Sequence, residues 1–108
     1  MKTSDLTGAQ LDYWVAMAEG FMRPRIEWGV CMVDQPDSRP MNPSTDWAHG
    51  GPIIERKKIM ISWNVDHWIS GANDAFDNPN SRIWSGRTAL IAAMRAHVAS
   101  RFGDEVPD

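Results

Sequence analysis

Residues 88–103, TALIAAMRAHVASRFG, carry the strongest structural signal in the chain. Apolar side chains recur along this stretch at the three- and four-residue spacing that places them on one face of an α-helix. Alanines fill much of the remainder and favour the helical state. Thr88 is suited to cap the first turn, and Gly103 is a natural stop. The stretch therefore predicts an amphipathic helix whose apolar stripe is Leu90, Ile91, Met94, Val98 and Phe102.

A second helix is predicted near the other end of the chain. Thr7 and Gln10 have the spacing of a capping box, and Gly20 is a natural stop. The apolar residues between them again recur at helical spacing. One buried face is expected, formed by Leu11, Trp14, Val15 and Ala18.

Three segments between the helices predict β-strands: residues 26–33, 58–63 and 67–70. The order helix, strand, strand, strand, helix indicates a small α+β domain over residues 1–103. In the arrangement we expect, a three-stranded antiparallel sheet carries both helices on one face. Residues 104–108 are acidic and are predicted to form a flexible tail.

A long proline- and glycine-rich loop, residues 34–52, is predicted between the first two strands. Connections of this length are uncommon in compact domains and are usually functional or mobile. Its end continues into STDWAHGGPIIERK, residues 44–57. One interpretation is architectural: Asp46 caps a turn, Trp47 fills the core, and the glycines supply unusual backbone angles. The other is a binding loop, in which glycine N–H groups receive a phosphate, Trp47 stacks on a base and Arg56 adds a charged fork.

Three stretches together resemble the NinX-like family of small proteins from tailed phages and prophages. They are MKTSDLTGAQLDYWVAMAEG, STDWAHGGPIIER and TALIAAMRAHVASRFGDEVPD, which cover roughly half the chain. Family members typically have a capped N-terminal helix, a Ser-Thr-Asp-Trp-x-x-Gly-Gly-Pro-Ile-Ile-Glu loop and a similar final helix. Ala89 departs from a proline that is common in relatives, and residues 64–87 look particular to this chain.

The resemblance implies a phage accessory protein. By class-level analogy, such proteins act against host defence, either by binding a host protein or by sequestering a nucleotide-derived immune signal.

The start of the last helix is a second candidate position for an anion. The free N–H groups of a first helical turn favour negative charge, and Arg87 and Arg95 lie nearby in sequence. The chain also has six tryptophans, and we expect some of them to line a pocket and stack on a planar ligand. The predicted ligand-binding residues are Asp46, Trp47, His49, Gly50, Gly51, Arg56, Arg87, Thr88, Arg95 and Trp14.

Several function classes are disfavoured by the sequence. The formal net charge of −3 argues against general nucleic-acid binding. Neither a long apolar run nor a signal-like start is present, so we expect no membrane association and a cytoplasmic location, in the host cell if the protein is phage-encoded. Cys31 is expected to be buried and His97 to lie on the surface, and the three dispersed histidines predict no metal site. Without a Walker loop, a dinucleotide fingerprint or a nucleophile elbow, we expect no catalytic residue, no cofactor and no enzyme activity.

The sequence thus favours a non-catalytic protein that captures a small anionic, nucleotide-derived ligand such as a host immune signal. Because a small domain has little interior for a pocket, the site is expected between the subunits of a homo-oligomer. One alternative is a protein–protein inhibitor that docks on a host factor through exposed Trp and Arg side chains. Another is a double-stranded RNA binding module, which has a similar order of helices and strands. The acidic balance of this chain and the absence of basic residues at the start of its second predicted helix argue against this alternative.

Overall fold

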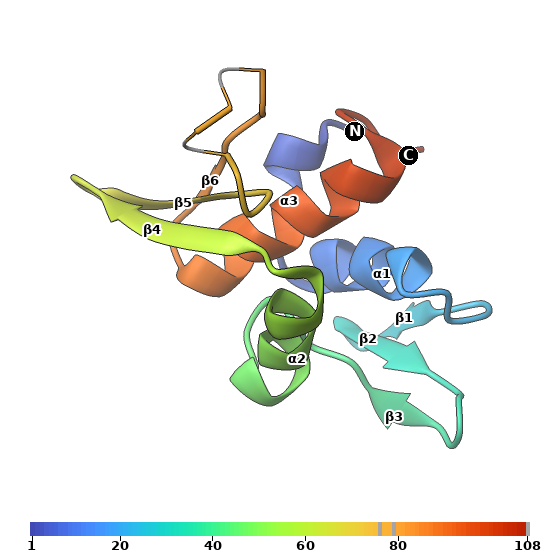
Figure 1. Ribbon diagram of the computed structural model, residues 1–108. Coiled ribbons are helices and arrows are strands. Elements are labelled where there is room, and N and C mark those ends of the chain that lie inside the picture. Colours follow the sequence, from blue (N-terminus) through green and yellow to red (C-terminus); the bar gives the residue numbers. More distant parts are fainter. Residues whose placement is uncertain (76, 79, 108) are drawn as a thin grey trace.

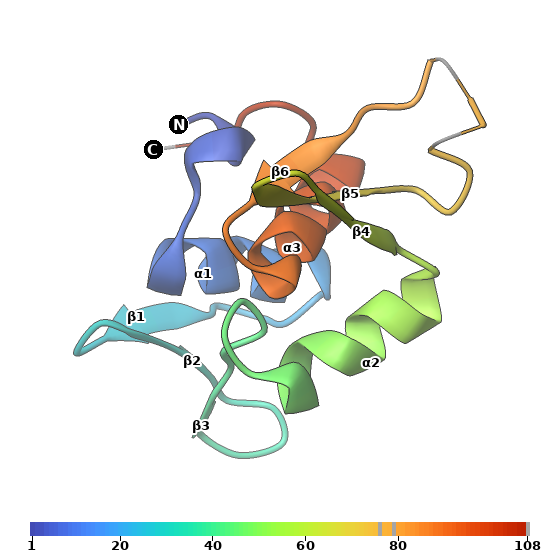
Figure 2. The same cartoon turned by 90° about the vertical axis from the view of Figure 1, so that its left-hand side faces the viewer.

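The central element of the fold is α3, Ala89–Phe102. The computed structural model describes residues 1–75, 77–78 and 80–107. In Figures 1 and 2, α3 lies beside α1, and the two helices separate a sheet on one side from a sheet on the other. Thr88 caps α3 as predicted, because its Oγ1 accepts a hydrogen bond from the Ile91 N–H at 3.1 Å. The apolar stripe predicted from the sequence faces the core, with Leu90, Met94 and Val98 buried.

The N-terminal helix α1 spans Gly8–Ala18 and follows a short 3₁₀ turn, Thr3–Asp5. Leu11 and Val15 are fully buried against α3 and the first sheet, as their spacing predicts. Thr7 occupies the N-cap position in an extended conformation, but its side chain makes no capping hydrogen bond in the described structure. The helix is therefore held by burial of its apolar face, and the predicted capping box is not formed.

The first sheet consists of β1 (Arg25–Glu27), β2 (Val30–Val33) and β3 (Arg39–Pro40), in the order β1-β2-β3. The sequence predicted one strand over residues 26–33, whereas the structure divides this run into a hairpin. Trp28 and Gly29 form its turn with φ angles of 56° and 75°, both in the left-handed region. Two successive positive φ angles are what a two-residue type I′ hairpin turn requires. Glycine adopts such an angle freely, which explains why the run breaks here.

The second helix of the chain in sequence order, α2, spans Trp47–Lys57. It replaces the second half of the predicted proline- and glycine-rich loop, and this prediction was wrong. Asp46 is its N-cap, with Oδ1 accepting from the Ala48 N–H at 2.9 Å. Pro52 lies inside the helix and removes one backbone donor. The glycine pair is tolerated because tertiary packing, and not helix propensity alone, stabilises this helix.

The second sheet consists of β4 (Met60–Asn64), β5 (His67–Gly71) and β6 (Trp84–Gly86) and packs on α3. The first two strands agree with the predicted ones, and β6 was not foreseen. Gly86 lets this sheet approach α3 closely: a Cβ atom there would come within 2.6 Å of the Ala92 backbone nitrogen. The α+β fold class is therefore confirmed, and the described residues form two three-stranded antiparallel sheets where one was expected.

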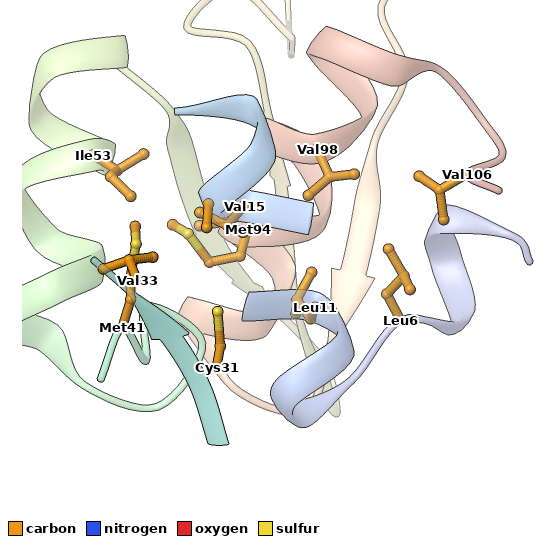
Figure 3. Close-up of a cluster of buried hydrophobic side chains, with 12 residues drawn as sticks. Leu6, Leu11, Val15, Cys31, Val33, Met41, Ile53, Met94, Val98 and Val106 are labelled. Carbon is orange, nitrogen blue, oxygen red and sulfur yellow. The ribbon is translucent and has the colours of Figure 1, made fainter. Parts of the chain in front are cut away.

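The core lies where α1, α3, β2 and α2 converge (Figure 3). Cys31 is fully buried there, as expected of a small apolar side chain. The segment after α3 also joins the core, because Val106 is 4% exposed and its N–H donates to the Met1 carbonyl at 2.9 Å. Residues 104–107 thus fold back on the N-terminus and differ from the predicted flexible tail, while residue 108 lies outside the described residues.

Candidate functional site

The start of α2 is tied to the segment before it through His49. The imidazole Nδ1 accepts a hydrogen bond from the Asn42 N–H at 2.9 Å, so a neutral His49 carries its proton on Nε2. That Nε2 lies 3.9 Å from Asp46 Oδ2, which is beyond hydrogen-bonding distance. The Nε2–H group therefore remains a donor toward the outer side of α2.

The two glycines do not form a phosphate-binding loop. Gly50 lies inside α2, and its N–H donates to the Asp46 carbonyl at 2.9 Å. A Cβ atom on Gly50 would come within 2.5 Å of the Pro43 carbonyl oxygen and 2.6 Å of Leu90 Cδ2. Gly51, by contrast, would meet only the Trp47 ring, at 3.8 Å. Gly50 is therefore required for close packing, and both glycines lie inside α2 and not in the predicted loop.

A shallow groove of about 220 Å³ runs along the outer face of α2. We call it the arginine groove, formed by Phe21, Arg39, His49, Pro52 and Arg56. Met41 and Ile53 supply an apolar floor and are both buried.

The groove draws its residues from three parts of the chain. His49, Pro52 and Arg56 recur at helical spacing and share one face of α2, while Phe21 follows α1 and Arg39 belongs to β3.

Arg39 is fixed at one side of the groove. Its Nε and Nη2 donate to the Gln35 carbonyl at 3.3 and 3.0 Å, and its guanidinium lies 5.6 Å from the centre of the Phe21 ring. Within the described residues, Nη1 of Arg39 makes no hydrogen bond. The side chain is thus held in place with one donor left over, which is the arrangement of a preorganised anion contact.

Arg56, a second arginine of the groove, is held by the partly buried carboxylate of Glu19. Its Nη2 pairs with Glu19 Oε1, while Glu19 Oε2 lies 2.9 Å from His97 Nε2. Glu19 is 12% exposed and His97 only 5% exposed at the side chain, whereas the Arg56 side chain is 54% exposed. In the described structure, Nε and Nη1 of Arg56 have no hydrogen-bond partner. The acid therefore positions Arg56 and occupies only one of its three nitrogens.

His97 was predicted to lie on the surface, and this was wrong. It is buried because Glu19 supplies a hydrogen-bond partner across the contact between α1 and α3, which compensates the cost of removing a polar ring from water. Burial lowers the pKa of His97 below its ordinary value, and the neighbouring Glu19 carboxylate opposes that shift.

Trp47 and Thr88 come together in a different hollow, of about 230 Å³, between the starts of α2 and α3. Trp47 is 54% exposed and does not fill the core, because the opposite face of α2 packs on α3. Thr88 uses its hydroxyl as a helix cap. Arg87 is exposed just before this cap, and the hollow gathers no charged side chain among its described lining residues.

Arg95 has a structural role. Its Nε donates to the Leu6 carbonyl at 2.9 Å and its Nη1 to the Ser85 carbonyl at 2.8 Å. These bonds join the N-terminal segment to β6 across α3, and burial lowers the pKa of the guanidinium from its ordinary value. The structure thus uses Arg95 inside the fold, away from the arginine groove.

Trp14 lies in a third place. Its ring makes edge-to-face contacts with Tyr13, at 5.2 Å between ring centres, and with Phe102, at 5.4 Å. It lines an apolar hollow of about 420 Å³ beside β1. The ten predicted residues therefore do not form one site, and the arginine groove contains two of them, His49 and Arg56.

A buried carboxylate supports the other face of α2. Asp12 on α1 is 4% exposed, and its Oδ1 accepts from the Ser44 N–H at 2.8 Å. Burial raises the pKa of Asp12, and the hydrogen bonds with Ser44 oppose that change. This contact anchors the entry to α2 and was not anticipated from the sequence.

Other kinds of site find no support in the described part of the chain. No group of three or more His, Cys, Asp or Glu side chains there is arranged to hold a metal ion. Among the described residues, no helix is both long and apolar enough to cross a membrane.

The chain matches one family model across nearly its whole length. That family is described as Bacteriophage P22, NinX, and the match covers residues 2–101. A search among curated proteins finds no match. The matched range includes each of the residues that form the arginine groove.

Proposed function

The chain belongs to the NinX family of bacteriophage P22, and we propose that it is a non-catalytic phage accessory protein that captures a small anionic ligand in the arginine groove. The observation that carries the proposal is the pair of fixed arginines with free donors on the two sides of one apolar groove. Guanidinium groups recognise phosphates and carboxylates through such donors.

The local charge of the groove supports an anion. Arg39 and Arg56 contribute two positive charges, and Glu19 is the only acid among the described residues that line it. That carboxylate already faces Arg56 and His97. The Nε2–H of His49, which also lines the groove, adds a neutral donor. An anion would therefore complete the coordination of side chains that are already in place.

The aromatic side of the groove favours a ligand with a flat ring. Arg39 stacks on Phe21, and the outer face of a guanidinium is itself a surface on which a nucleobase stacks. The groove, at about 220 Å³, is smaller than the roughly 300–1,000 Å³ of ordinary ligand pockets. A mononucleotide-sized ligand, or the phosphate end of a larger one, suits that space.

Isothermal titration with a panel of nucleoside monophosphates, cyclic mononucleotides and inorganic phosphate tests this proposal. We expect at least one nucleotide to bind, and each of Arg39→Ala and Arg56→Ala to weaken it about tenfold or more, because each removes a charge-assisted hydrogen bond. Arg101→Ala is the charge-matched control, since Arg101 lies on α3 against Phe102 and outside the groove.

Two results would contradict the proposal. One is binding that Arg39→Ala and Arg56→Ala leave unchanged. The other is binding that is lost with Arg87→Ala, which would place the ligand at the start of α3.

A second candidate function is docking on a host protein through the β4–β5 hairpin. Trp63 is 55% exposed and Val65, in the turn, is 87% exposed. The Trp63 ring contacts Trp68 edge to face, with 5.5 Å between the ring centres. An exposed tryptophan that packs on a second, partly buried one is typical of an interface hot spot. Capture of one host protein by the wild type that is lost with Trp63→Ala and kept with Arg56→Ala would favour this function.

A further inference from the structure

The strand β1 has a free edge. It pairs with β2 on one side, in the register Arg25↔Met32, Ile26↔Cys31 and Glu27↔Val30. Among the described residues, no strand pairs with its other side. The opposite edge of the sheet is β3, whose second residue is Pro40 and offers no N–H group. β1 is therefore the edge of this sheet that is open to another strand.

The turn fixes which groups β1 presents. In a two-residue hairpin, the residues that flank the turn, here Glu27 and Val30, exchange both backbone hydrogen bonds. The next pair, Ile26 and Cys31, is then a non-hydrogen-bonded pair. The N–H and C=O of Ile26 consequently point away from β2, toward the free edge.

An apolar hollow lies beside this edge. It measures about 420 Å³ and is lined by Tyr13 and Trp14 of α1, by Ile26 itself and by Leu6 and Pro107. Ile26 shares its sheet face with Cys31, which is fully buried under α1, yet Ile26 is 45% exposed. A further strand would lie about 4.8 Å beyond β1, and its inward side chain would enter this hollow.

The sequence of β1 indicates which strand fits. Arg25-Ile26-Glu27 has opposite charges on either side of a central apolar residue. When this strand pairs antiparallel with a second copy of itself about Ile26, Arg25 lies opposite the partner's Glu27, and Glu27 lies opposite the partner's Arg25. Arg25 and Glu27 already pair within one chain, with 2.7 Å between Arg25 Nε and Glu27 Oε1. In this register the two intrachain pairs therefore meet as a cluster of four charges, in which opposite charges face each other and like charges do not.

We propose that the protein forms a two-fold symmetric dimer through β1, in which Ile26 meets the partner's Ile26 and the two hollows close over both side chains. The two sheets then continue as one sheet across the symmetry axis, as isologous contacts do. The same register brings Trp28, which is 100% exposed in the single chain, beside the partner's Pro24.

The two outer strands of the second sheet fit a second copy less well. Neither β4 nor β6 contains a charged residue that would set an antiparallel register with itself. The Arg25-Ile26-Glu27 pattern and the adjacent hollow are both specific to β1. A contact of three residues per strand is small, so we expect a dissociation constant on the order of 1–100 μM.

Sedimentation velocity over a concentration series tests the dimer. The wild type is expected to shift from one chain of 12.2 kDa to twice that mass as concentration rises. Arg25→Glu and Glu27→Arg each place like charges opposite each other in a homodimer, and each variant is expected to remain monomeric. Mixed in equal amounts, the two variants have opposite charges at both facing positions, and we expect a heterodimer to form.

Proline substitutions separate this edge from the other one. Ile26→Pro removes the outward N–H without disturbing the pairing of β1 with β2, and it is expected to abolish the dimer. Trp63→Pro makes the matched change on β4, where Trp63 is also in a non-hydrogen-bonded pair, and is expected to leave the dimer intact. Circular dichroism confirms that each variant is folded.

Three results would overturn the proposal. The first is a wild type that stays monomeric up to about 1 mM, a concentration at which a contact of this size is populated. The second is a dimer that survives Ile26→Pro and is lost with Trp63→Pro. The third is a charge-variant mixture that remains monomeric. None of these results bears on ligand binding in the arginine groove, which does not include β1.

Discussion

The two faces of α2 differ in how closely they pack and in how many of their polar groups are hydrogen-bonded within the protein. Toward α3, Gly50 meets the Pro43 carbonyl and the Leu90 side chain with no space for a methyl group. Toward β3, His49 and Arg56 keep donors that no described residue accepts from. The architectural interpretation of this segment applies to the inner face of the helix, and we propose the binding interpretation for the outer face. The tightly packed inner face thus positions an outer face whose polar groups keep donors without a described partner.

The largest effect is expected from filling the space at Gly50. Gly50→Ala would force the Pro43 carbonyl and Leu90 apart and lower the free energy of unfolding by about 3 kcal/mol. Gly51→Ala is the matched control in the same helix, and we expect it to raise that free energy by about 0.5–1 kcal/mol, because alanine favours helix over glycine. Urea unfolding of both variants measures the difference. Equal effects would show that α2 has no tightly packed inner face.

The next effect concerns the buried anchor of the inner face. Asp12→Ala leaves the Ser44 N–H buried without a partner and is expected to cost about 2 kcal/mol of stability. Asp12→Asn keeps an oxygen acceptor and removes the buried charge. Since burial raises the pKa of Asp12, the wild type loses stability relative to this variant as pH rises above 3.8 through the raised pKa. Urea midpoints of the three proteins at pH 4 and pH 7 test both statements, and an Asn variant as unstable as the Ala variant would contradict them.

The outer face is expected to matter little for stability. Arg39 and the half-exposed Arg56 make contacts at the surface, where ion pairs contribute about 0–1 kcal/mol. Arg39→Ala and Arg56→Ala should therefore unfold within about 1 kcal/mol of the wild type while losing ligand affinity. Thermal unfolding alongside the titration separates the two properties. Loss of more than about 3 kcal/mol in either variant would assign that arginine to the architecture.

The smallest effect is a pH dependence of the free energy of unfolding, caused by His97 on α3. Burial holds the pKa of His97 below its usual 6.5, so the folded protein prefers the neutral ring. As pH falls, His97 therefore becomes protonated in the unfolded chain before it does so in the folded protein. The free energy of unfolding consequently decreases below about pH 6.5. His97→Gln should flatten this dependence, because it removes the buried ring whose pKa is lowered. Urea midpoints from pH 5 to pH 8 provide the measurement, and an unchanged slope in His97→Gln would refute the assignment.

Local patterns predicted the elements that are themselves local. The Thr88 cap and the apolar stripe of α3 need only helical spacing, and both are present in the structure. The sequence also contained a signal for α2 that was not used: Asp46 stands at a cap position, and His49, Ile53 and Arg56 recur at helical spacing. Gly50, Gly51 and Pro52 favoured a loop instead, because all three have low helix propensity. Propensity does not include the close packing that stabilises α2 in the folded protein.

The residues of the proposed site were anticipated less completely than the fold class. Arg56 and His49 were among the residues predicted from the sequence because they lie within one unusual segment. Phe21 and Arg39 were missed because neither stands in a motif, and only the tertiary fold brings them to the same groove as the residues of α2. Arg95 was assigned to a ligand although it bonds to two backbone carbonyls, because Leu6 and Ser85 lie outside its own helix and no local pattern reveals them as partners.

Native mass spectrometry of the protein incubated with extract from defence-activated host cells tests the central claim most directly. The wild type should gain a mass of nucleotide size, and the folded double variant Arg39→Ala/Arg56→Ala should not. The Arg101→Ala protein should retain the added mass. A wild type without any added mass, or a double variant that carries the same ligand, would contradict the assignment of ligand capture to the outer face of α2.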